Sequence, residues 1–195
     1  MVDPIGGPIG RSFSIDAEES VHSWYVFGLV RRTVVAPSGE RFERTYLSTP
    51  GAVGIVAVTD EGSVLLVRQY RATLHESILE IPAGMRDKPG EAAEVTAERE
   101  LHEETGFTAR SLTRLGSIIS SPGVTDSIVE IHLAEGLTRG APVPHGPEEQ
   151  EMELLEVPFE IALSMVDDGR ITDSKTVAGL LLTARLRPDL LTRTR

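Results

Sequence analysis

The strongest structural signal in this sequence is the stretch EAAEVTAERELHEETGF, residues 91–107. Its periodicity predicts a helix over 91–105 that stops at Gly106, because glycine readily takes the left-handed conformation that ends helices. The stretch carries glutamates at positions 91, 94, 98, 100, 103 and 104, and Arg99 is the one Lys or Arg among them. Which way these carboxylates face therefore decides what the helix can do.

The helix has a single apolar stripe. At about 100° per residue, Ala93, Ala97 and Leu101 fall on this stripe, and Glu100 and Glu104 project within roughly 40° of it. Small alanines let that face come close to a sheet, so we expect both carboxylates at the margin of the core. The ordinary alternative for an acidic helix is a solvated face.

Two such carboxylates, four residues apart, repel each other and are costly to desolvate. A divalent cation compensates them, and a site built from oxygen ligands selects Mg²⁺, with Mn²⁺ as a substitute. Glu103, one residue away, is placed to reach a second ion. Solvent exposure is expected for Glu94, Glu98 and His102.

Composition limits the classes of function. The chain has 195 residues, 40% hydrophobic and 25% charged, which fits one compact domain with a sizeable core. It has no Cys, and 19 Lys plus Arg against 30 Asp plus Glu give a net charge of −11. Such a charge disfavours nucleic acid and anionic membranes as partners. No apolar run reaches membrane-spanning length and no signal peptide is recognisable, so we expect a cytoplasmic protein.

Strand patterns outnumber helix patterns, which predicts a mixed α/β (α+β) fold. We expect a flexible leader over 1–20, an N-terminal antiparallel β appendage over 21–50, and one domain over 51–195. Turn residues at 37–40 and 60–62 predict two hairpins. The expected strands are 23–35, 41–48, 53–59, 64–70, 78–81, 113–120, 128–134 and 152–157, and further helices are expected at 159–168 and 175–186.

The stretch from Arg99 to Phe107 resembles the second half of the Nudix box, Arg-Glu-apolar-x-Glu-Glu-x-Gly-apolar, at every position. Glu91 stands seven intervening residues before Arg99, as in that box, whereas Gly84 precedes Glu91 by six rather than five, so the connecting loop is one residue longer. The resemblance implies a Nudix α/β/α sandwich with a mixed sheet. It also implies Mg²⁺ on Glu100, Glu104 and Glu103, and Arg99 as a structural partner of Glu91.

Features outside the box resemble the ADP-ribose pyrophosphatase group of Nudix hydrolases. Arg68-Gln69-Tyr70-Arg71 and Leu79-Glu80-Ile81-Pro82-Ala83-Gly84 look like that group's strand and the loop before its box. The resemblance implies a metal ligand in the Ala83 carbonyl and a substrate contact in Arg71, whose planar guanidinium suits a diphosphate. The alternative for Arg71 is a surface ion pair with Glu80 or a neighbour. The other substrate contacts implied are Glu80, Met85 and Asp126.

Two further segments look like the same group. Pro122 lies sixteen residues past Gly106, and Asp126-Ser127 follows where relatives commonly have Asp-Glu, so a contact from that second acid is missing. Asp173-Ser174-Lys175-Thr176 precedes an apolar helix, and helix capping explains Asp173 or Ser174 equally well.

An acidic loop is the source of the expected general base. The resemblance implies that one glutamate here is a base or an extra metal ligand; Glu148 is the first choice, Glu151 the second, and Glu149 the third. A solvated charge run is the alternative. The histidines show no paired spacing, which favours structural or surface roles.

These residues together predict Mg²⁺-dependent hydrolysis of ADP-ribose to AMP and ribose 5-phosphate. One alternative is a different nucleoside diphosphate derivative, such as a nucleotide sugar, NADH or a dinucleoside polyphosphate. Another is a sensor that binds ADP-ribose without cleaving it. The resemblance also implies a homodimer that exchanges N-terminal strands, with Trp24 or Phe27 either stacking on adenine or packing in the core.

Overall fold

Two parallel strands, β4 (Ala52–Ala57) and β10 (Ile128–Glu135), lie at the centre of the larger of two compact units. The computed structural model describes residues 12–143 and 145–191. The larger unit comprises 51–120 and the chain from 128 onward, and the smaller unit comprises the chain up to 50 together with 121–127.

The larger unit has a mixed sheet of order β7-β4-β10-β9, in which β9 and β7 are antiparallel to their neighbours. A second, antiparallel sheet has the order β12-β5-β6, and β11 pairs with β8. The fold is thus the mixed α and β class predicted. The remaining strands are β5 (Ser63–Arg71), β6 (Glu76–Glu80), β7 (Ala83–Met85), β8 (Phe107–Thr108), β9 (Ser111–Ile119), β11 (Thr138–Arg139) and β12 (Glu153–Pro158).

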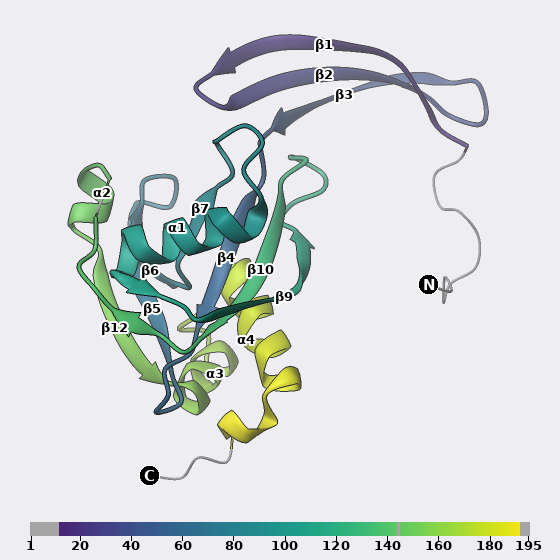
Figure 1. Ribbon diagram of the computed structural model, residues 1–195. Helices are drawn as coiled ribbons and strands as arrows, with labels where there is room; N and C mark the ends of the chain where they lie inside the picture. Colours follow the sequence, from purple (N-terminus) through teal and green to yellow (C-terminus); the bar gives the residue numbers. More distant parts are fainter. Residues whose placement is uncertain (1–11, 144, 192–195) are drawn as a thin grey trace. The chain divides into compact units, whose positions relative to one another are not determined.

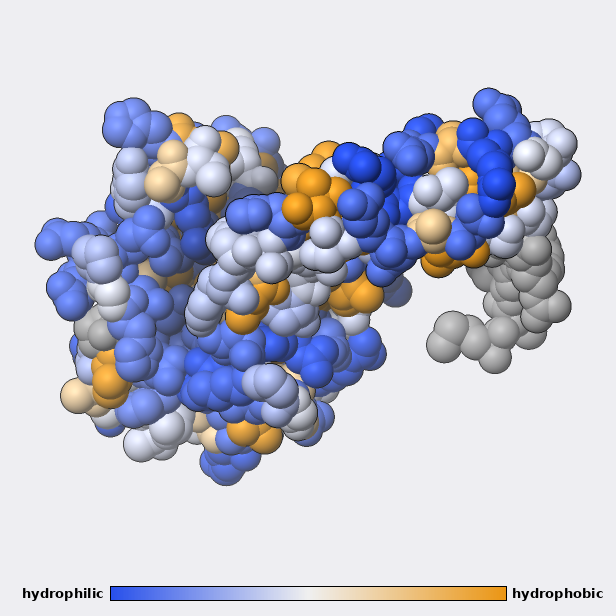
Figure 2. Space-filling model, turned by 90° about the horizontal axis from the view of Figure 1, so that it is seen from above, coloured by the Kyte–Doolittle hydropathy of each residue, from blue (hydrophilic) through white to orange (hydrophobic). Residues whose placement is uncertain are grey.

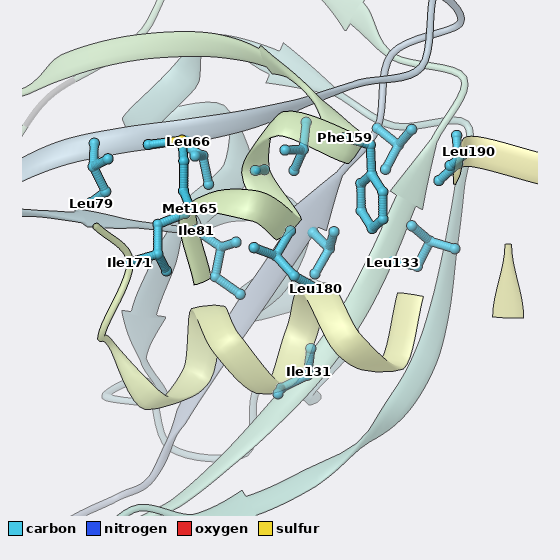
Figure 3. Packing of buried hydrophobic residues seen from close by; sticks show 14 residues of the cluster. Leu66, Leu79, Ile81, Ile131, Leu133, Phe159, Met165, Ile171, Leu180 and Leu190 are labelled. Atoms are coloured by element: carbon cyan, nitrogen blue, oxygen red, sulfur yellow. The ribbon is translucent and has the colours of Figure 1, made fainter. Parts of the chain in front are cut away.

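Helices cover both faces of the central strands (Figure 1). Side chains of β4 alternate between the two sides: Ile55 packs with Ala97 and Leu101 of α1, and Val56 packs in the cluster that contains Leu180 of α4. Figure 3 shows this second cluster, with Phe159 and Leu180 among its buried side chains. The helices are α1 (Ala93–Thr105), α2 (Pro147–Gln150), α3 (Phe159–Asp167) and α4 (Ser174–Leu186), followed by a 3₁₀ turn, η1 (Pro188–Leu191).

The prediction of a hairpin around residues 60–62 was wrong, because the two strands on either side of this turn do not pair as a hairpin. β4 and β5 belong to different sheets and are joined by one isolated bridge, between Val58 and Val64. β4 pairs with β10 and β7, and β5 pairs with β12 and β6, so each strand takes its partners in its own sheet rather than from its neighbour in sequence. A turn signal fixes the reversal of the chain but not the pairing that follows it.

The smaller unit is an antiparallel meander, β1-β2-β3, made of β1 (Ser14–Trp24), β2 (Phe27–Val35) and β3 (Arg41–Ser48). The hairpin expected around 37–40 is present. The expected leader was wrong over 14–20, which is strand, and residues 1–11 lie outside the described part. Alternation is hidden in β1 because every one of its residues is exposed.

Backbone pairing between neighbouring strands joins this meander, and ion pairs lie on its surface. None of its described residues is fully buried, and β1 is tied to β2 by ion pairs such as Arg32 with Glu18 at 2.7 Å. Trp24 is exposed and contacts the Phe27 ring, so the core role considered for Trp24 is not found. Figure 2 shows hydrophobic side chains scattered among hydrophilic ones on the molecular surface. Among the described residues no helix is long and apolar enough to cross a membrane.

Candidate active site

The helix expected from the sequence to carry the metal ligands is α1. It begins at Ala93, two residues later than predicted, and ends at Gly106, whose φ of 76° is left-handed as expected. A Cβ at Gly106 would lie 2.7 Å from the backbone nitrogen of Pro142. The stop therefore allows the strand-to-loop segment around Gly140–Pro142 to pack directly against the end of the helix.

Glu100 and Glu104 face inward, as their angle to the apolar stripe predicted. Their exposed fractions are 9% and 7%, whereas Glu94 and Glu98 are exposed. His102 departs from the expectation of solvent exposure: it is half-buried, because the segment after β11 covers that side of the helix.

The loop before the helix holds these carboxylates. The Ala83 backbone N–H donates to Glu104 Oε2 at 3.1 Å. A Cβ at Gly84 would lie 1.9 Å from the Glu100 carboxyl carbon, so only glycine leaves room for that carboxylate. Residues 83–85 form β7, which pairs with β4, so the sheet itself positions the loop against the helix.

Both carboxylates have raised pKa values. Burial raises the pKa of Glu104 to about 8, opposed by the Ala83 N–H and reinforced by the charges of Glu100 and Glu149. Burial also raises the pKa of Glu100, and the neighbouring Arg99 guanidinium opposes it. The folded environment therefore disfavours the charged form of both carboxyl groups, and a cation placed beside them would offset that penalty.

Arg99 gathers the other acids of the box. Its guanidinium contacts Glu100 at 2.7 Å and Glu103 at 2.8 Å, and on its other side Glu91 at 3.3 Å. The expected Arg99–Glu91 pairing is confirmed. Thr96 adds a hydrogen bond from its hydroxyl to Glu91 at 2.9 Å, which anchors the residue that precedes the helix.

The donor set fits a divalent cation. It consists of buried carboxylate oxygens with raised pKa values beside a loop that only glycine can complete. Among the residues that the structure describes, no three acidic or histidine side chains already converge on one point. Arg99 Nη1 instead donates hydrogen bonds to both Glu100 and Glu103.

A cavity of about 340 Å³ opens beside the same loop. Its lining includes Ala83, Gly84 and Met85 on one side and Arg71, Asp173 and Lys175 on the other. The structure thus brings the expected residues Arg71 and Met85 to one cavity with the loop that touches Glu100 and Glu104. A larger cavity, of about 530 Å³, lies against β6 and the segment after α3 and shares no lining residue with this one.

Glu80 lies under this cavity and organises its cations. Its side chain is 2% exposed and accepts two hydrogen bonds from Arg71, both at 2.6 Å, as well as an ion pair from Lys175. Burial alone would raise the pKa of Glu80, but the Arg71 hydrogen bonds and the Lys175 charge outweigh it and hold the pKa below its ordinary value. Glu80 is therefore a buried anchor, and the ion pair considered for Arg71 is present.

The acidic loop contains α2, and its three glutamates differ. Glu149 accepts a hydrogen bond from the His145 backbone N–H, and its charge contributes to the raised pKa values of Glu100 and Glu104. This coupling favours Glu149 over Glu148, the first choice from the sequence, and over Glu151.

Three residues outside the box have structural positions that the sequence left open or did not predict. Asp173 caps α4, because its carboxylate accepts from the Thr176 N–H at 3.0 Å. Lys175 was not among the site residues predicted from the sequence. The feature that marks it is its position as a cation in the first turn of a helix, where acidic residues are usually preferred. Asp126 belongs to the smaller unit, where its carboxylate accepts from Ser48 at 2.8 Å and from the Thr49 N–H at 2.9 Å.

The fold and this arrangement of carboxylates define the class of protein. A family model described as NUDIX domain matches residues 48–178, and the chain belongs to that family. Nudix hydrolases are in general dependent on divalent metal ions.

Three similar proteins indicate which group within the Nudix family this chain resembles. An ADP-ribose pyrophosphatase of Bacillus subtilis is 42% identical over 160 residues, covering 82% of this chain and 86% of its own length. An ADP-ribose pyrophosphatase of Mycobacterium tuberculosis is 37% identical over 172 residues, covering 88% and 83%. A crystal structure of an ADP compounds hydrolase aligns with a TM-score of 0.78 at 25% identity, covering 92% of this chain and 96% of that one. The resemblance drawn from the sequence is confirmed.

Proposed function

We propose that this protein hydrolyses the diphosphate of ADP-ribose to AMP and ribose 5-phosphate, with Mg²⁺ as its ion and Mn²⁺ as a substitute. The observation that carries the proposal is the pair of buried carboxylates, Glu100 and Glu104, held against a loop that also lines a cavity with cationic residues. The names of the two relatives support ADP-ribose as the substrate.

The residues that would hold the ion are Glu100, Glu104, Glu103 and the carbonyl of Ala83. A bound divalent ion neutralises a diphosphate and lowers the pKa of water. The Ala83 N–H and the absence of a side chain at Gly84 keep Glu104 and Glu100 in place. We assign Arg71 to orient the diphosphate, because its guanidinium lines the cavity and Glu80 fixes its plane.

The proton of the attacking water needs an acceptor. We assign this role to Glu149, because it accepts a hydrogen bond from the N–H of His145, whose ring lies 3.5 Å from Glu103, and because its charge acts on Glu100 and Glu104. Water attacks one phosphorus, the bridging P–O bond breaks, and Glu149 takes up the proton. Glu149→Gln should lower kcat by roughly 10²-fold or more, the usual contribution of a general base. Glu148→Gln and Glu151→Gln are matched controls from the same loop, and an equal loss in either of them would contradict the assignment.

The substrate assignment is tested by product analysis. Purified protein with Mg²⁺ is given ADP-ribose, GDP-mannose, NADH and diadenosine polyphosphates at equal concentration, and products are quantified by chromatography. The proposal expects AMP and ribose 5-phosphate from ADP-ribose at the highest rate. Comparable rates on GDP-mannose would remove the narrower assignment, and saturable binding without product would indicate a sensor.

We also propose a homodimer formed through the meander β1-β2-β3. Phe13, Ile15 and Trp24 are exposed at 51%, 60% and 46%, and none of the described residues of this unit is fully buried. Apolar surface without a core indicates a surface that another chain covers. Light scattering should give the mass of two chains, and Ile15→Lys should shift it toward one. The cytoplasmic location stays a prediction.

A further inference from the structure

The buried face of α4 carries two threonines that differ in their hydrogen bonds. The buried residues of this helix are Thr176, Gly179, Leu180 and Thr183, at the spacing that places side chains on one helix face. Both threonines are fully buried. Within the described part of the chain, the Thr183 hydroxyl has no hydrogen-bond partner, whereas the Thr176 hydroxyl has two. Packing of this face alone therefore does not account for the bonds of Thr176.

The Thr176 hydroxyl ties α4 to the segment that connects β6 with β7. Its oxygen accepts a hydrogen bond from the Ile81 N–H at 2.9 Å, and the hydroxyl donates to Asp173 Oδ2 at 2.6 Å. Ile81 opens the metal-site loop, residues 81–84, which follows β6 and leads into β7. The Ile81 side chain is fully buried in the same cluster as Leu180 of α4 (Figure 3). Both the main chain and the side chain of Ile81 are thus held at α4.

The metal-site loop is also held by the central sheet, and it fits its surroundings tightly. The Pro82 carbonyl accepts a hydrogen bond from the Ile55 N–H of β4 at 2.8 Å. Two residues later, a Cβ at Gly84 would lie 1.9 Å from the Glu100 carboxyl carbon. Because the loop and this carboxylate are so close, a shift of the loop displaces a proposed metal ligand. The bonds at the start of the loop therefore bear directly on the geometry of the site.

We propose that the Thr176 hydroxyl positions the metal-site loop against the two inward-facing carboxylates of α1. This inference rests on the proposed function, since it takes those carboxylates and the Ala83 carbonyl as metal ligands. Thr176 is fully buried and is not part of the cavity lining, so it acts through the loop and not on the substrate. Without its hydroxyl, the Ile81 N–H is buried with no acceptor from this side chain, and the loop is free to shift. Loss of a bond that orients metal ligands typically weakens metal binding roughly 10- to 100-fold.

The test compares three variants of α4. Thr176→Val has nearly the same shape but no hydroxyl, and Thr176→Ser keeps the hydroxyl but loses a methyl group. Thr183→Val makes the same change at the buried threonine whose hydroxyl has no partner among the described residues. Mn²⁺ binding to metal-depleted protein, followed by electron paramagnetic resonance, should be roughly tenfold weaker in Thr176→Val. Thr176→Ser and Thr183→Val should bind within about twofold of the wild type, because both leave the bond to Ile81 in place.

Amide hydrogen exchange gives a readout that needs neither metal nor substrate. The Ile81 amide loses its acceptor in Thr176→Val, so it should exchange roughly tenfold faster than in the wild type, measured relative to the Leu133 amide of β10. Leu133 serves as the reference for opening of the whole domain. Melting temperatures separate positioning from stability, because Thr176→Ser loses a buried methyl group and should melt lower while keeping its Mn²⁺ affinity.

Failure of this role and failure of the proposed function give different results. Wild-type protein that binds Mn²⁺ but releases no product from ADP-ribose overturns the proposed function alone. Equal Mn²⁺ affinity in the wild type and Thr176→Val, or unchanged relative exchange of the Ile81 amide, overturns the role of Thr176 alone. Equal losses of affinity in Thr176→Val and Thr183→Val also overturn it, because the hydroxyl of Thr176 is then not special.

The serine variant decides the question even if Thr176→Val does not fold. A folded Thr176→Ser protein that melts lower than the wild type and binds Mn²⁺ within about twofold of it supports the role of the hydroxyl. Weakened Mn²⁺ binding in the folded serine variant overturns that role, because affinity then follows the packing of the side chain and not its hydrogen bond.

Discussion

Gly84 is the position where a change of one carbon most directly displaces a carboxylate of the proposed metal site. In Gly84→Ala, the new Cβ would lie 1.9 Å from the Glu100 carboxyl carbon and 2.2 Å from each of its oxygens. Real Cβ atoms essentially never approach closer than 3.0 Å, so the carboxyl carbon must move by 1.1 Å or more. Misplacement by about 1 Å costs on the order of 10²-fold in rate. We therefore expect kcat/KM to fall by about 100-fold or more.

The assay is initial-rate hydrolysis of ADP-ribose across a Mg²⁺ titration, with urea unfolding alongside. Because the new Cβ would meet the end of a flexible side chain, the free energy of unfolding should fall by about 1 kcal/mol, the low end for overpacking, which leaves a folded protein to assay. Gly116→Ala is the matched control, because its Cβ would meet only Leu182 Cδ1, at an ordinary 3.8 Å. A Gly84→Ala enzyme with kcat/KM near that of Gly116→Ala would refute the placement of Glu100 in the site.

Three further outcomes follow from the charged groups. Arg99→Met should lower the free energy of unfolding by about 3 kcal/mol, measured in urea, because Glu91, Glu100 and Glu103 lose their shared partner. Glu80→Gln should lower stability by a similar amount at pH 7, since Arg71 and Lys175 lose their anion. Because the folded pKa of Glu80 lies below its ordinary 4.5, that contribution is present above about pH 4.5 and is lost as the pH falls through the folded pKa; unfolding from pH 7 to 3 should show the difference from wild type shrinking. Asp173→Ala should cost about 1 kcal/mol through the lost cap of α4, and thermal unfolding measures it.

Local periodicity predicted helix α1 well. The angular positions of Glu100 and Glu104 relative to Ala97 and Leu101 follow from helix geometry alone, so their burial could be derived before any tertiary contact was known. The stop at Gly106 was predictable for the same reason, because a left-handed residue is a local requirement.

Long-range pairing was not predictable in this way. β4 and β5 are consecutive and separated by a turn, yet they take their partners in different sheets, which depends on residues 77 to 95 positions away. β1 was missed because no face of it is buried, so its sequence lacks the alternation that marks a strand.

The candidate site shows the same difference between what local sequence predicts and what depends on long-range contacts. The acids on α1 could be assigned from one segment, whereas Glu80, which binds Arg71 of β5, also pairs with Lys175 of α4, 95 residues further along the chain. The Arg71–Glu80 pair was one of the alternatives drawn from the sequence, but the sequence gives no sign that Lys175 joins it. Likewise, the choice among Glu148, Glu149 and Glu151 depends on the electrostatic interaction of Glu149 with Glu100 and Glu104, which the run of acids does not encode.

The most direct test of the central claim is a titration of metal-depleted protein with Mn²⁺, followed by electron paramagnetic resonance of the free ion. The wild type is expected to bind Mn²⁺, and Glu104→Gln, which keeps the shape of the side chain but removes its charge, to bind it at least about tenfold more weakly. Glu94→Gln, on the exposed face of the same helix, should bind as the wild type does. Equal Mn²⁺ affinity in the wild type and Glu104→Gln would contradict the claim that the inward-facing acids of α1 form the metal site.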